Sequence, residues 1–215
     1  MLPIPADIFT EPEVSPNDLE NLGPLRRLAG VWEANKGVDI NPKAKGPERR
    51  VFREHVRMDP IDPQTNGPQL FYGLRYHIHI NTPEEKITFH DQVGYWLWEP
   101  ATGLIMQSVT IPRGQVVLAS GLAKPGDKTI SVTAKRGDTR YGICSTEFLD
   151  EAFRTTSYRC DITFNDDGSW TYEIQTELQV KGQPFNHHDT NTLKLIEPPR
   201  LNPLAVMLNA GTDKR

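Results

Sequence analysis

Cysteine is scarce in this sequence. Only Cys144 and Cys160 occur, and their spacing matches no metal-binding motif. We therefore expect reduced thiols and a cytoplasmic protein rather than a disulfide-stapled secreted one. Residues 1–13 have neither a basic start nor a long apolar core, so no secretory signal is predicted.

Long apolar runs and clusters of basic residues are also missing. No stretch approaches the ~18 consecutive apolar residues of a membrane-spanning helix, so we expect no membrane insertion. The formal net charge is −4 and lysine and arginine form no run, so a nucleic-acid-binding surface is not expected. Hydrophobic residues make up only 37% of the chain, a value that alternating, half-buried strands would produce.

Strand-like segments dominate what is present. The 18 prolines and 16 glycines are scattered, and turn-forming sequences such as NDDG at 165–168 separate most of the alternating segments. Ten short strands in sequence, mostly without helices between them, predict antiparallel neighbours in a barrel or a sandwich. The ten segments are 28–34, 49–58, 69–80, 86–100, 103–111, 115–121, 128–135, 153–164, 169–180 and 182–195.

Two short helices are predicted beside these strands. Ser15 followed by Pro16 is a helix start signal and predicts a helix at about residues 16–22. Residues 141–153 do not alternate, and either Ser145 or Thr146 could cap a helical turn in a loop over one barrel end.

The chain is expected to form one domain with an extension at each end. Residues 1–27 would form an N-terminal extension, 28–197 the ligand-binding barrel and 198–215 a C-terminal extension. The apolar run at 204–208 predicts that the C-terminal extension packs on something. Oligomeric state stays open, with a homodimer as one alternative.

His77 and His79 form an H-x-H pair on one predicted strand. Side chains at i and i+2 share one face of a strand, and Glu84 or Glu85 follows, which resembles the first metal motif of cupins. The second cupin motif is missing, because Val117 stands where a histidine should follow the Pro-x-Gly at 112–114.

Several segments read together resemble the nitrobindin family of heme-binding, fatty-acid-binding-protein-like β-barrels. The matching features are Gly30 and Trp32 in the first strand, His90 before Gly94 and Tyr95, the Pro-x-Gly at 112–114, and the histidines of the last strand. The resemblance covers about residues 28–196. The chain departs from the family where Gly37 is the only glycine left after Trp32, so it resembles a divergent member.

This resemblance implies a ten-stranded antiparallel up-and-down β-barrel of the lipocalin/fatty-acid-binding-protein type that binds heme. A late histidine would then ligate the iron, and His90 would lie near the distal side. The family spacing favours His188, whereas strand alternation places His187 with Leu193 and Leu195, so both histidines remain candidates. Nitric oxide binding and peroxynitrite isomerisation are activities that the resemblance implies.

Aromatic and histidine side chains on adjacent predicted strands are candidates to line the pocket. These are Tyr76, His77, His79, Tyr95, Trp96 and Trp98. The alternative function is a heme-free carrier or sensor of a fatty-acid-like or other hydrophobic ligand, in which Arg75, Arg113 or Lys194 would meet a ligand carboxylate.

Overall fold

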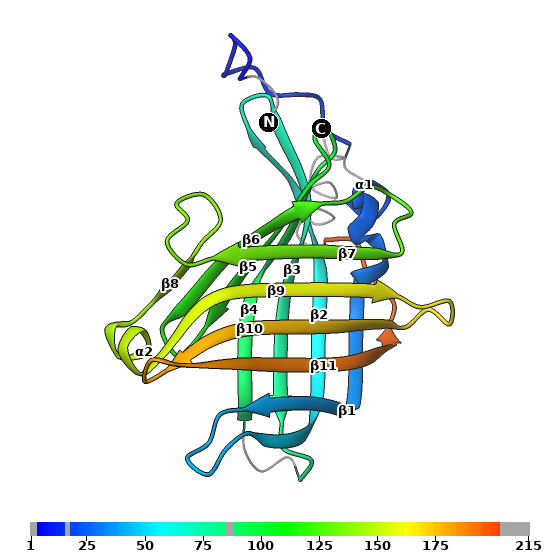
Figure 1. The fold of residues 1–215 in the computed structure, drawn as a ribbon. Coiled ribbons are helices and arrows are strands. Elements are labelled where there is room, and N and C mark those ends of the chain that lie inside the picture. Colours follow the sequence, from blue (N-terminus) through cyan, green and yellow to red (C-terminus); the bar gives the residue numbers. More distant parts are fainter. Residues whose placement is uncertain (1–3, 16–17, 85–87, 203–215) are drawn as a thin grey trace.

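The protein is an antiparallel β-barrel with a few short helices (Figure 1). The computed structural model describes residues 4–15, 18–84 and 88–202. The barrel strands are β1 (Gly30–Asn41), β2 (Glu48–Asn66), β3 (Gln69–Asn81), β4 (Thr88–Glu99), β5 (Leu104–Ile111), β6 (Gln115–Leu122), β7 (Thr129–Lys135), β9 (Phe153–Phe164), β10 (Trp170–Val180) and β11 (Gln183–Glu197).

The strand order confirms the predicted ten-stranded, up-and-down barrel. Neighbours follow the order β5-β4-β3-β2-β1-β11-β10-β9-β7-β6, and pairing of β5 with β6 closes the ring. The junction between β6 and β7 is thin, because Ser120 and Thr133 are its one registered pair among the described residues. A three-residue strand that the sequence did not predict, β8 (Ile143–Ser145), pairs along β6 beside this junction.

Strand β2 is longer than expected. The predicted strand ended at Met58, before a stretch with three prolines at positions 60, 63 and 68. In the structure β2 continues to Asn66 and turns into β3 at Gly67, whose φ of +55° suits glycine. A register shift between Ile61 and Gln64 accommodates Pro63, whereas Pro60 keeps its register opposite Leu74.

Helices occupy the two ends of the barrel. α1 (Asp18–Asn21) and the 3₁₀ helix η1 (Gly23–Leu28) replace the helix predicted at 16–22, whose first two residues lie outside the described part. α2 (Glu147–Ala152) follows Thr146 at its N-cap position, one of the two caps considered. In Figure 1, α1 and α2 lie at opposite ends of β9, β10 and β11.

The end of the barrel beneath η1 is packed shut. Leu22, Leu25 and Leu28 are fully buried there, and each such burial contributes about 1.5–3 kcal/mol. The Trp32 indole donates a hydrogen bond of 2.8 Å to the Leu28 carbonyl and meets Trp170 edge-on, with ring centroids 5.8 Å apart. Any opening to the interior must therefore lie at the α2 end.

Two further expectations meet different outcomes. Cys144 and Cys160 are both free, in line with reduced thiols. The apolar run at 204–208 lies outside the described residues, so its packing stays a prediction.

Within the part of the chain that is described, every helix is too short or too polar to cross a bilayer.

Candidate functional site

A cavity of about 540 Å³ opens toward α2. Its volume falls within the ~300–1,000 Å³ range of small-molecule and cofactor pockets. Inward-facing residues of nearly every barrel strand line the cavity, and most of this lining is apolar. Representative wall residues are Phe52, Met58, Ile80, Trp96, Val109 and Ile162.

Of the two late histidines, His187 faces the cavity. Strand alternation along β11 sends His187, Asp189, Asn191 and Leu193 inward, and Leu193 is fully buried. His188 takes the opposite phase and does not line the cavity. The family spacing, which favoured His188, and the strand alternation, which favoured His187, thus diverge, and the geometry follows the alternation.

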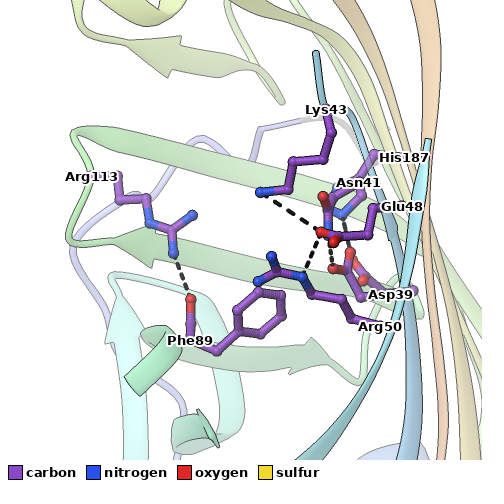
Figure 2. Close-up of polar contacts among 9 residues, drawn as sticks. Asp39, Asn41, Lys43, Glu48, Arg50, Phe89, Arg113 and His187 are labelled. Carbon is purple, nitrogen blue, oxygen red and sulfur yellow. Dashed lines mark hydrogen bonds and ion pairs between the residues drawn. The ribbon is translucent and has the colours of Figure 1, made fainter. Parts of the chain in front are cut away.

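The imidazole of His187 is held by two carboxylates (Figure 2). Its Nε2 lies 2.7 Å from Asp39 Oδ1, a contact drawn in Figure 2. The same nitrogen lies 3.6 Å from Asp189 Oδ2. Asp39 is buried, with a side chain only 3% exposed, and it also accepts a hydrogen bond from the Asn41 amide. No described residue hydrogen-bonds to the other ring nitrogen of His187, Nδ1, which leaves it open for a ligand.

Burial and mutual charge set the protonation of this cluster. Burial and the charge of Asp39 raise the pKa of Asp189 to about 7, although His187 opposes the shift. Burial alone would raise the pKa of Asp39, but the hydrogen bonds from His187 and Asn41 lower it overall. Burial disfavours the charged imidazole, yet the bond to Asp39 and the charge of Asp189 raise the pKa of His187.

A second buried carboxyl group, that of Glu54, also lines the cavity. Glu54 accepts hydrogen bonds from the Asn191 amide at 2.7 Å and the Tyr172 hydroxyl at 2.9 Å. Burial nevertheless raises the pKa of Glu54 to about 7, against the effect of both hydrogen bonds. The interior therefore contains an acid that is partly protonated near neutral pH.

His90 lines the cavity at the start of a hydrogen-bond chain. Its Nε2 lies 3.3 Å from the side-chain oxygen of Gln92, Oε1. The side-chain nitrogen of Gln92, Nε2, donates a hydrogen bond to the Tyr76 hydroxyl at 2.8 Å. That hydroxyl donates to the Ser108 carbonyl at 2.7 Å. Burial lowers the pKa of His90, so its imidazole is neutral at neutral pH.

Cationic side chains gather at the mouth. Lys43 and Arg113 line the cavity, and the Arg113 guanidinium donates to the Phe89 carbonyl at 2.6 Å. Lys43 and Arg50 both lie near Glu48, at 3.9 and 2.7 Å (Figure 2). A ligand that enters this opening with an anionic group would meet the two lining cations.

The other pocket candidates lie in four different places. Trp96 lines the cavity, whereas Trp98 packs against Gly23 at the closed end and donates to the Ala123 carbonyl. Tyr76 is buried in the wall behind Gln92.

Three further candidates lie on the outer surface because their strand phase opposes that of the lining residues. Tyr95 is 43% exposed, and His77 and His79 hydrogen-bond to Asp91 outside the barrel. Of the arginines and lysines that the carrier alternative needs, Arg113 lines the cavity, whereas Arg75 and Lys194 are exposed.

Sequence reasoning missed Asp39 and Glu54, two of the three acidic residues of the site. Asp189 is detectable, because it is two residues from His187 on the same face of the same strand. Asp39 is not, because a register shift in β1 between Ala34 and Gly37 changes which residues face inward. In a regular strand, residues an odd number of positions apart point to opposite faces. Trp32 lies before the shift and Asp39 after it, and both are buried inside the barrel although they are seven positions apart.

This donor set can serve two kinds of chemistry. An imidazole that lines an apolar cavity and has one nitrogen hydrogen-bonded to a carboxylate suits a ligand of heme iron. Apolar walls with cations at the opening suit a hydrophobic ligand that ends in a carboxylate.

Comparison with known proteins supports the fold and the ligand class. A family model described as "THAP4-like, heme-binding beta-barrel domain" matches residues 21–194. No curated protein matches the chain. Among solved structures, Rv2717c from M. tuberculosis superposes with a TM-score of 0.58 at 16% identity, covering 85% of this chain and 99% of that chain. That likeness concerns the fold alone.

Proposed function

This chain belongs to the family of THAP4-like heme-binding β-barrel domains, and from that premise we propose that its cavity binds heme with His187 as the iron ligand. The observation that carries the proposal is the placement of His187 on the cavity wall with Asp39 hydrogen-bonded to one ring nitrogen. Histidine ligands of metals typically have such a partner, which orients the ring and raises its basicity.

The residues fit this cofactor in their chemistry. The ring nitrogen of His187 that is not engaged by Asp39 would bind the iron, and the apolar walls would contact the macrocycle. Lys43 and Arg113 at the mouth would pair with the two carboxylates of heme. Ligation through Nδ1 requires that this nitrogen carry no proton, and the one proton of the neutral ring would then stay on Nε2, which would donate it in the hydrogen bond to Asp39.

Chemistry at the bound group would involve small reactive nitrogen species. A bound heme supplies an iron that can take nitric oxide or peroxynitrite, the activities implied by the resemblance to nitrobindins. His90 lines the same cavity, and its Nε2–H donates to the Gln92 side-chain oxygen, so the other nitrogen of the neutral ring has no proton to donate and His90 would restrict the space beside a small bound ligand. Its predicted role is therefore positioning rather than iron ligation.

Hemin titration of the purified full chain tests the proposal. We expect wild type to give a saturable Soret band at one hemin per chain, and His187→Ala to weaken binding at least tenfold. His188→Ala is the matched control, because His188 is the next residue in the sequence but lies on the outer face of β11. It should bind hemin within twofold of wild type.

Two outcomes would contradict the proposal. One is wild-type binding no tighter than that of an unrelated β-barrel, and the other is a Soret band that survives His187→Ala at full strength. A protein that does not bind hemin but carries an extractable carboxylate lipid on isolation would support the heme-free carrier, which the cations at the mouth favour. Mass spectrometry of the organic extract would identify such a lipid.

A further inference from the structure

A second cluster of metal-ligating side chains lies outside the cavity. His77 and His79 alternate on β3 and point to the outer face, and Asp91 on β4 is the registered partner of His79. The side-chain donor atoms of all three residues lie within 4.8 Å of one another. The barrel wall thus brings two imidazoles and a carboxylate together on adjacent strands.

The three side chains converge on one point. His77 Nε2 lies 3.0 Å and His79 Nδ1 lies 3.2 Å from the same Asp91 oxygen, Oδ2. With zinc–ligand distances of about 2.0–2.1 Å in a tetrahedral site, neighbouring donor atoms are about 3.3 Å apart. The observed separations therefore match two edges of a tetrahedral coordination shell with little rearrangement.

We propose that His77, His79 and Asp91 form a binding site for a divalent transition-metal ion, with Zn²⁺ as the best match. Two imidazoles select borderline ions such as Zn²⁺ over Mg²⁺ and Ca²⁺, which prefer all-oxygen shells. The side chains of His77 and His79 are 52% and 35% exposed, so the fourth position is open to water or to a donor from another molecule.

The outer site is separate from the cavity cluster of Asp39, His187 and Asp189. That cluster also has three potential metal ligands, but it faces the barrel interior, where His187 is assigned to heme iron. His77 and His79 do not line the cavity. The proposal for the outer site would therefore still stand if the protein did not bind heme, and the heme proposal would still stand if the outer site did not bind a metal ion.

Isothermal titration of the heme-free full chain with ZnCl₂ tests the site. We expect one Zn²⁺ per chain in wild type, and binding weakened at least tenfold in His77→Ala, His79→Ala and Asp91→Asn. All three side chains are at least one-third exposed, so the variants should fold, and circular dichroism checks this.

Two further variants serve as controls. His55→Ala removes an outward histidine that is the registered neighbour of His79 but turns its ring toward Glu33, at 3.2 Å. His187→Ala removes the cavity histidine. Both should bind Zn²⁺ within twofold of wild type.

Several results would overturn the outer site. These are no Zn²⁺ binding by wild type, less than threefold weakening in all three ligand variants, or loss of binding in His187→Ala. As a second readout, Co²⁺ should give a visible absorption band typical of tetrahedral coordination in wild type and none in His77→Ala. A Co²⁺ spectrum that is unchanged in His77→Ala would also contradict the assignment.

Discussion

At the scale of single residues, the unusual feature of this barrel is the number of carboxyl groups in its interior. Asp39 and Glu54 are buried, and Asp189 lines the cavity. A buried carboxylate costs free energy unless it is paired or protonated. Asp39 is paired with His187, whereas Glu54 has only neutral hydrogen-bond donors. Glu54 should therefore make the stability of the protein depend on pH.

Glu54→Gln tests this dependence. The pKa of Glu54 is about 7 in the folded protein against 4.5 as its ordinary value, so the folded state holds the proton more tightly. Its contribution to stability is complete below pH 4.5 and is lost as the pH rises to 7 and above. The variant minus wild-type difference in unfolding free energy should grow by up to about 3 kcal/mol from pH 4.5 to 8. Urea denaturation across this range measures it, and a difference that stays flat would refute the argument.

The residues of the site were only partly predictable from the sequence. His187 could be chosen from strand alternation, against the family spacing that favoured His188, and His90 could be chosen from motif spacing. Asp39 could not, because the irregularity in β1 resets the inward phase and leaves no sequence signal of its own. The same alternation rule, applied to β3, separates His77 and His79 from the cavity once the direction of the strand is known.

At the scale of elements, two neighbouring strands of the barrel, β4 and β5, approach each other unusually closely. A Cβ atom on Gly94 would lie 1.9 Å from the Ser108 carbonyl oxygen, so β4 and β5 touch here through their backbones. The registered pairs of these strands skip from Val93 to Trp96 at this point. The glycine before Tyr95, which the family resemblance singled out, is thus required by backbone packing rather than by a ligand.

Gly94→Ala should destabilise the barrel by about 3 kcal/mol, because one backbone must move away from the other. Gly182→Ala is the control, since Gly182 has a φ of +80° and open space around its Cα. Strain in the left-handed region alone should cost about 1–2 kcal/mol there. Denaturant unfolding of both variants compares them, and equal losses would mean that the close contact at Gly94 has no separate cost.

Most of the strands could be predicted from the sequence. All ten predicted strands exist, because alternation and turn residues mark each one. The extensions of β1 past Ala34 and of β2 past Met58 were missed, and so was the short β8, which depends on pairing with the distant strand β6 rather than on local pattern.

At the scale of the whole molecule, the two ends of the barrel differ in what fills them. Three leucines, Trp32 and Trp98 pack the η1 end shut, and the opposite end keeps a cavity with polar groups at its mouth. The family resemblance predicted the closed barrel and a ligand inside it. The volume of the cavity could not be predicted, because it depends on which large side chains turn inward along each strand.

The position of iron in crystals of the protein grown with hemin tests the account most directly. Anomalous diffraction at the iron absorption edge would locate the metal without any assumption about the ligand. We predict a single strong peak inside the barrel, at about 2 Å from a ring nitrogen of His187, as in a metal–imidazole bond. A peak beside His188 or on the outer face near His77 and His79, or an empty cavity at saturating hemin, would contradict the claim.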